Sequence, residues 1–155
     1  MAILVGSKAP DFTLPGWYDL AEDRFSMSAQ RGHPLVLAFY PGDERLVCTR
    51  QMCAYSDNIA DLHRFDAAVW GIAPQSVESH QQFAEGRHLK MPLLADLDGQ
   101  VATDYGILGA FGLRRSVFVI NRDGVITWRW VSTTNLTFPS AADIKSAVAG
   151  AKAAA

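Results

Sequence analysis

The two cysteines of this 155-residue chain, Cys48 and Cys53, lie close together in the segment FYPGDERLVCTRQMC, directly after an apolar run. Such a pair could form a disulfide, bind a metal, act as a redox pair or pack in a core without chemistry. A metal site needs about four ligands, and none of the four histidines shows metal-ligand spacing with the cysteines. A reactive thiol and two structural cysteines therefore remain the main alternatives.

Cys48 is expected in the first turn of a helix that follows a buried strand. Unpaired backbone N–H groups and the positive end of the helix dipole meet there, and both favour a thiolate over a thiol. The cations Arg45 and Arg50 are close in sequence and act in the same direction. The turn from strand to helix is also where α/β sheets place their chemistry. Cys48 is therefore the candidate nucleophile.

Cys53 lies further along the same expected helix. At about 100° per residue it is rotated by roughly 140° from Cys48, and the two Cα atoms would be about 8–9 Å apart. A disulfide requires a Cα separation below about 7 Å. The two cysteines can therefore bond only if the first turns of the helix unwind, which would make oxidation a conformational switch.

The hydrophobic pattern predicts alternating strands and helices. The apolar runs at 34–40 and 67–74 are typical of strands buried on both faces. From Cys48 onward, apolar residues recur every three or four positions as far as Leu62, which predicts an amphipathic helix. Further strands are expected at Asp11–Leu14, Arg24–Met27, 91–96, 116–120 and 125–131, and further helices at 76–88, 100–105 and from Ser140 to Gly150.

These elements predict an α/β fold with a mixed central sheet flanked by helices. Alternation in the last strand places Ile126, Trp128 and Trp130 on one face. We expect a single domain over residues 1–155, with residues 151–155 as a frayed tail.

Composition narrows the possible partners and compartment. The net charge is −2 and the 14 Lys and Arg residues are scattered, which argues against a nucleic-acid partner. No secretory signal or membrane-spanning segment is visible, so we expect a cytoplasmic protein without a membrane partner. Cysteines in that compartment are typically catalytic or metal-binding, and the sequon at Asn135 is then without consequence. The histidines, His80 among them, are expected at the surface.

Several motifs that follow one another in order resemble the peroxiredoxin family. They are GSKAPDFTLP, LVLAFYPGD, the Cys48-x4-Cys53 spacing, MPLLADLDG with YGI, and RSVFVINRDGVI. The pattern is most similar to the branch called peroxiredoxin Q or bacterioferritin comigratory protein, and it covers about residues 6–131. The resemblance implies a thioredoxin-like fold with an N-terminal β extension. It also implies thiol-dependent reduction of hydrogen peroxide and organic hydroperoxides, without a metal or other cofactor.

The resemblance further implies a role for each matching residue. Cys48 would be the peroxidatic cysteine, which becomes a sulfenic acid, and Cys53 the resolving cysteine, which closes an intramolecular disulfide. Pro41 would shield the thiolate from water, and Arg115 would hold the thiolate and the peroxide oxygen by charge-assisted hydrogen bonds. Arg114 is expected at the surface. A thioredoxin-like dithiol would reduce the disulfide, and we expect a monomer or weak dimer.

One position departs from the family pattern, which has a threonine three residues before the cysteine. Arg45 stands there, and Leu46 and Val47 replace the usual small or proline residues. A threonine hydroxyl can accept the peroxide proton while it donates to the thiolate, whereas arginine only donates. Arg45 is therefore expected to modify the site. The alternative function is a redox-sensing or binding protein on the same fold, with weakened peroxidase activity.

Overall fold

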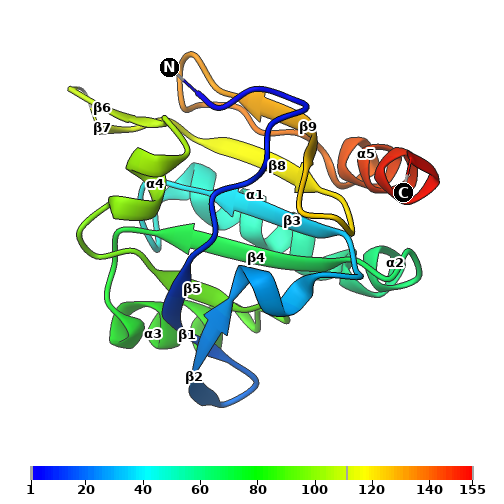
Figure 1. Ribbon diagram of the computed structural model, residues 1–155. Helices are drawn as coiled ribbons and strands as arrows, with labels where there is room; N and C mark the ends of the chain where they lie inside the picture. The colour runs from blue at the N-terminus through cyan, green and yellow to red at the C-terminus, as the bar shows by residue number, and fades with distance from the viewer. Residues whose placement is uncertain (1, 111, 155) are drawn as a thin grey trace.

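The computed structural model describes residues 2–110 and 112–154, which form one mixed sheet with helices on both faces (Figure 1). The strands are β1 (Thr13–Tyr18), β2 (Ala21–Ser26), β3 (Leu35–Phe39), β4 (Ala68–Ala73), β5 (Leu93–Ala95), β8 (Ser116–Ile120) and β9 (Ile126–Val131), and β6 (Leu108–Gly109) pairs with β7 (Gly112–Leu113) as a separate ribbon. The helices are α1 (Leu46–Asp57), α2 (Ile59–His63), α3 (Val77–Arg87), α4 (Gln100–Asp104), α5 (Ala141–Ala154) and the 3-10 helix η1 (Met27–Gln30). None of the described helices is long and apolar enough to cross a membrane.

The sheet has the strand order β2-β1-β5-β4-β3-β8-β9, with β3 near its centre. β3 runs parallel to β4 and antiparallel to β8. All five residues of β3 are buried, because both of its faces are covered, as its unbroken apolar run predicted. The mixed sheet flanked by helices is therefore confirmed.

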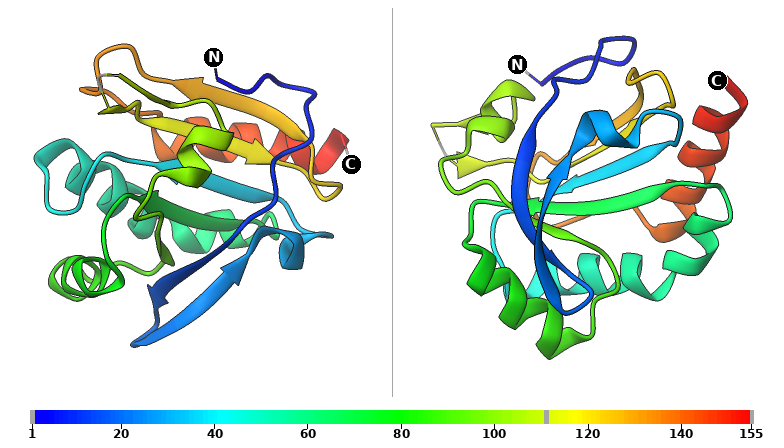
Figure 2. Two further views of the ribbon diagram at one scale, coloured as in Figure 1. Left: turned by 60° about the vertical axis from the view of Figure 1, so that its left-hand side comes forward. Right: turned by 60° about the horizontal axis from the view of Figure 1, so that its bottom comes forward.

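The two faces of the sheet carry different layers (Figure 2). Val36 and Ala38 of β3 pack in a core with buried residues of α1, α2, α3 and α5. Leu35 and Leu37 face the opposite core, which includes η1, α4 and the segment before β1. The larger helices, among them the one that carries both cysteines, thus lie on one side of the sheet.

The N-terminal hairpin differs from the prediction in its length. β1 and β2 extend beyond the expected strands Asp11–Leu14 and Arg24–Met27, and only Asp19 and Leu20 separate them. Gly16 lies inside β1, where a Cβ atom would be 2.7 Å from a backbone oxygen of β5. A glycine in this sequence therefore marks a close approach of two strands and not a turn.

The helix that carries the cysteines and the C-terminal helix also end at other residues than expected. The predicted apolar stripe is buried, but Asn58 separates α1 from α2, and its Nδ2 donates to the backbone oxygen of Ala54 over 2.8 Å. α5 continues to Ala154, past Gly150, where the sequence predicted its end. Ala155 lies outside the described residues, and a frayed tail stays a prediction.

The last strand contains a β-bulge that the sequence did not reveal. Val119 pairs with Trp128 while the next residue, Ile120, pairs with Ile126, so Thr127 is an extra residue in β9. Ile126 therefore packs in one core and Trp128 against the other. The prediction that the alternating apolar residues of this strand share one face is wrong, because the bulge reverses the alternation.

Candidate active site

The candidate nucleophile lies where the chain leaves β3 and enters α1. Arg45 is the N-cap residue, with an extended backbone (φ −75°, ψ 145°), and its side chain makes no capping hydrogen bond. Cys48 is the third residue of α1 and is fully buried. It lies in the first turn, among the N–H groups that have no partner within the helix, as the sequence predicted.

Arg115 contacts the sulfur because of the register between β3 and β8. Ser116 lies opposite Phe39 in the antiparallel pair, so Arg115 enters the sheet beside the end of β3. Its Nη2 donates to Sγ of Cys48 over 3.1 Å, and the residue is only 2% exposed. A buried guanidinium in hydrogen-bond contact stabilises an anionic thiolate relative to the neutral thiol.

A chain of hydrogen bonds fixes the orientation of this guanidinium. Nη1 of Arg115 donates to Oε1 of Gln51 over 2.6 Å, and Nε2 of Gln51 donates to the hydroxyl of Tyr55 over 3.3 Å. The Tyr55 hydroxyl donates to the backbone oxygen of Pro139 over 2.8 Å. Burial raises the pKa of Tyr55 above its ordinary value, so this group remains a neutral donor. Gln51 was not among the predicted site residues, although its spacing from Cys48 places both on one helical face.

Asn135 holds the other side of Arg115. Its Oδ1 accepts from the backbone N–H of Arg115 over 2.8 Å, and its backbone oxygen accepts from Nε over 3.3 Å. Asn135 has a φ of 61°, a left-handed conformation that asparagine tolerates better than most residues. In the sequence, Asn135 stands out only as part of a sequon. Arg114 is exposed, as expected, and donates to the backbone oxygen of Ser132.

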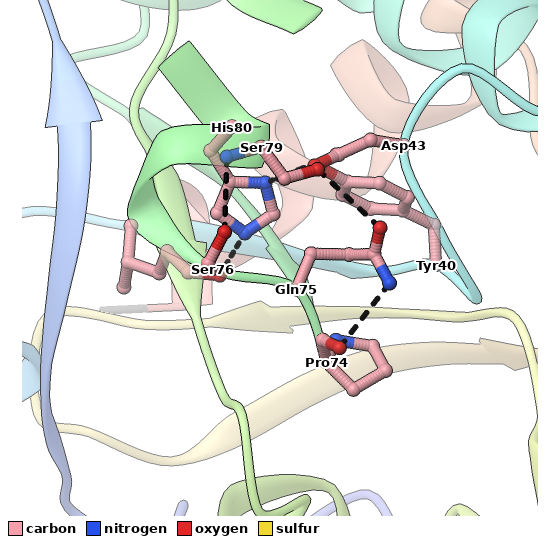
Figure 3. A network of polar contacts seen from close by, with 8 residues as sticks. Tyr40, Asp43, Pro74, Gln75, Ser76, Ser79 and His80 are labelled. Atoms are coloured by element: carbon pink, nitrogen blue, oxygen red, sulfur yellow. Dashed lines mark hydrogen bonds and ion pairs between the residues drawn. The ribbon is translucent and has the colours of Figure 1, made fainter. Parts of the chain in front are cut away.

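A second buried polar network holds the loop between β3 and α1 (Figure 3). The hydroxyls of Tyr40 and Ser79 each donate to the Asp43 carboxylate over 2.7 Å. His80 Nδ1 lies 2.8 Å from Oδ2 of Asp43, and its Nε2 donates to the backbone oxygen of Leu94 over 2.8 Å. The network therefore ties the loop to α3 and to β5.

The pair of His80 and Asp43 shares a proton in a dry environment. A backbone oxygen and a carboxylate only accept hydrogen bonds, so a proton must lie between Nδ1 and the carboxylate as well as on Nε2. The two side chains are 0% and 2% exposed. The prediction that His80 lies at the surface is wrong, because it lies on the inward face of α3 together with the buried Phe83 and Ala84.

A cavity of about 570 Å³ opens at the start of α1, where Arg115, the residue that contacts Cys48, is part of its wall. Pro41, Arg45, Leu46, Leu113, Arg115 and Asn135 are among its lining residues. Pro41 is half-buried and forms part of the cavity wall. The Arg45 side chain is exposed and lies over Gly42, where a Cβ atom would be 2.9 Å from its Nε. The guanidinium of Arg45 makes no hydrogen bond or ion pair with any residue that the structure describes.

Cys53 has different surroundings on the same helix. Its side chain is partly exposed, and neither cysteine is in a disulfide. Burial raises the pKa of the Cys53 thiol, the charge of Asp57 adds to this effect, and Arg87 opposes it. Since α1 is continuous from Cys48 to Cys53, the Cα separation of about 8–9 Å given by helix geometry applies and precludes a bond in place.

Comparisons with known proteins agree with this geometry. Residues 5–129 match the AhpC/TSA family. Peroxiredoxin Bcp of Bacillus subtilis is 30% identical over 138 residues, which cover 84% of this chain and 86% of that protein. The chloroplastic peroxiredoxin Q of Sedum lineare is 36% identical over 124 residues, which cover 78% of this chain and 65% of that protein.

A solved structure extends the similarity to three dimensions. The crystal structure of the peroxidoxin BcpB from Mycobacterium tuberculosis superimposes with a TM-score of 0.79 at 30% identity, over 96% of both chains. The chain therefore has the thioredoxin-like fold of the peroxiredoxins. From its sequence and its fold, this chain belongs to the AhpC/TSA family of peroxiredoxins.

Proposed function

We propose that the protein is a thiol-dependent peroxidase that reduces hydrogen peroxide and organic hydroperoxides with Cys48 as its nucleophile. One observation carries the proposal: Nη2 of Arg115 lies 3.1 Å from Sγ of Cys48 in a buried helix turn beside an open cavity. The relatives, which are named as peroxiredoxins, favour this enzyme over a redox sensor without peroxidase activity.

In the first step, the Cys48 thiolate attacks one oxygen of the peroxide. The O–O bond breaks, the sulfur becomes a sulfenic acid, and the other oxygen takes up a proton and leaves as water or an alcohol. Negative charge moves from the sulfur to the leaving oxygen, and the Arg115 guanidinium, which donates to the sulfur, would stabilise that charge. Pro41, at the rim of the cavity, would limit the access of water to the thiolate.

In the second step, the Cys53 thiol attacks the sulfur of the sulfenic acid. A disulfide forms and water leaves. The start of α1 must unwind for this step, and two features support such an opening. The helix has no side-chain cap at Arg45, and the buried hydroxyl of Thr49 has no hydrogen-bond partner among the described residues. Unwinding would let water satisfy that hydroxyl, whose burial without a partner costs about 1–3 kcal/mol.

The enzyme then requires two electrons from outside. A dithiol attacks the disulfide, passes through a mixed disulfide and restores both thiols. A thioredoxin-like protein is the reductant that this chemistry favours. We place the reaction in the cytoplasm, where such dithiols are kept reduced, and we expect the protein to act as a monomer or weak dimer.

Peroxide consumption in the presence of dithiothreitol tests the proposed activity. The wild-type protein should consume hydrogen peroxide catalytically, and Cys48→Ser should consume none above the rate of dithiothreitol alone. A variant Cys48→Ser that matches the wild-type rate would overturn the assignment of the nucleophile.

A further inference from the structure

Arg45 is a cation without a partner at the edge of the candidate active site. Its side chain lines the same cavity as Arg115, but Arg115 is committed to Cys48 and Gln51, whereas Arg45 contacts no described carboxylate. Asp43, two residues before Arg45, has its carboxylate in the buried network of His80. Glu44, the neighbouring residue, is exposed and forms no ion pair with Arg45 among the described residues. The guanidinium of Arg45 is therefore available to an anion that enters the cavity.

The cavity also presents an apolar surface, which a small polar molecule such as hydrogen peroxide would not contact favourably. Leu46, Leu108 and Leu113 line it, and the exposed fractions of Leu46 and Leu108 are 72% and 38%. A volume of about 570 Å³ is in the range of sites that bind small organic ligands. The exposed leucines would gain from contact with the hydrocarbon part of a substrate.

From this arrangement, and on the basis of the proposed peroxidase activity, we infer that the preferred substrate is an organic hydroperoxide that carries a carboxylate. The hydroperoxide group faces Cys48 and Arg115, the hydrocarbon covers the leucines, and Arg45 binds the carboxylate. No carboxylate side chain is among the described residues that line the cavity. The planar guanidinium also suits bidentate binding of a carboxylate.

This assignment gives a function to the residue that departs from the family pattern. The chemistry at the sulfur is unchanged: the O–O bond breaks, Cys48 becomes a sulfenic acid and an alcohol leaves. The carboxylate contact lies outside these reacting atoms, so Arg45 sets specificity and affinity. Its effect should appear in kcat/KM for charged substrates relative to neutral ones.

Cumene hydroperoxide and its meta- and para-carboxylate derivatives provide matched probes, because they share one reactive group and differ in one remote charge. We expect the wild type to prefer at least one carboxylate derivative over cumene hydroperoxide by about fivefold or more in kcat/KM. Arg45→Gln should reduce that ratio to near unity. Arg50→Gln, which removes an exposed arginine of α1 that does not line the cavity, should leave the ratio as in the wild type.

A second readout is independent of turnover. The compound para-isopropylbenzoate lacks an O–O bond and should shift the NMR signals of the cavity residues in the wild type, with binding weakened about fivefold or more in Arg45→Gln. A preference for the carboxylate derivatives that Arg45→Gln retains would overturn the role of Arg45, as would equal rates for all three hydroperoxides. If the wild type reduces none of them, the proposed peroxidase activity itself fails and this inference fails with it.

Discussion

Helix α1 places its two cysteines in opposite environments. Cys48 is fully buried and its sulfur accepts a hydrogen bond from a guanidinium that Gln51 and Asn135 hold in turn. Cys53 is partly exposed, and its sulfur makes no hydrogen bond with a described residue. In the proposed mechanism Cys48 reacts where it lies, whereas Cys53 can bond to it only after the start of α1 unwinds.

This difference indicates which step of the proposed catalytic cycle requires a change in structure. Two buried networks, one around Arg115 and one around His80, hold the start of α1 and the loop before it in the arrangement from which Cys48 would attack peroxide in the proposed mechanism. The disulfide, in contrast, requires that the first turn of α1 leave this arrangement. Stabilising the loop should therefore favour attack on peroxide, and loosening it should favour disulfide formation.

The largest expected effect is the opening of the helix start on oxidation. In the disulfide form, amide hydrogen exchange over residues 42–53 should rise by about a hundredfold or more, because the first turns of α1 lose their hydrogen bonds. Exchange in β3 should change little, and reduction should restore protection. Equal protection of α1 in both redox states would contradict the requirement for unwinding.

The His80 network should contribute strongly to stability. Asp43→Ala removes the buried partner of the His80 ring and of two hydroxyl donors, and should lower the free energy of unfolding by about 3–5 kcal/mol. Urea denaturation measures this change. Glu44→Ala, an exposed carboxylate in the same loop, is the matched control and should change stability by less than about 0.5 kcal/mol. A similar small effect at Asp43 would mean that the network does not hold the loop.

Arg115 should matter most for the rate of attack on peroxide. Arg115→Gln removes the charged donor to Cys48 and should lower the second-order rate constant for hydrogen peroxide by about 10²–10³-fold. Stopped-flow measurement with the neighbouring variant Arg114→Gln separates this effect from a general loss of positive charge. Arg114 is exposed and does not contact the sulfur, so its variant should stay within about twofold of the wild type. Equal losses in the two variants would contradict a specific role for Arg115.

A smaller change in the rate of attack on peroxide is expected from a substitution at Arg45. A threonine there would be the N-cap residue of α1, with Cys48 at the third helical position. Arg45→Thr supplies a hydroxyl that can accept the peroxide proton and should raise the rate with hydrogen peroxide by about tenfold or more. A threonine cap should also stabilise the helix start by about 1 kcal/mol and so slow the disulfide step. Arg45→Gln removes the charge without supplying a hydroxyl, and an equal gain there would show that the hydroxyl is not the cause.

The sequence was sufficient to predict the mixed sheet with its flanking helices and the positions of Cys48 and Arg115 in these elements. The apolar run of β3, the helix start at Cys48 and the place of Arg115 before a strand all follow from local patterns. These patterns are strong because a strand buried on both faces and a helix that follows it leave few arrangements of the chain.

The residues that were missed depend on contacts far apart in the sequence. His80 and its partner Asp43 are 37 residues apart, so local sequence does not reveal that they pair. The position of His80 three residues before the buried Phe83 could have placed it on the inward face of α3. Asn135 meets Arg115 across 20 residues through a loop with a left-handed residue. The bulge at Thr127 depends on how β9 pairs with β8. The alternation of apolar and polar residues along one strand carries no information about such a pairing.

The most direct test is the intact mass of the protein before and after one equivalent of hydrogen peroxide. The wild type should lose two hydrogens as one chain, which shows an intramolecular disulfide. Cys53→Ser should gain oxygen at Cys48 and then over-oxidise, because no second thiol traps the sulfenic acid, and Cys48→Ser should keep its mass. A wild-type protein that gains oxygen and never loses two hydrogens would contradict the pairing of Cys48 with Cys53, and a wild type that does not react at all would contradict the peroxidase.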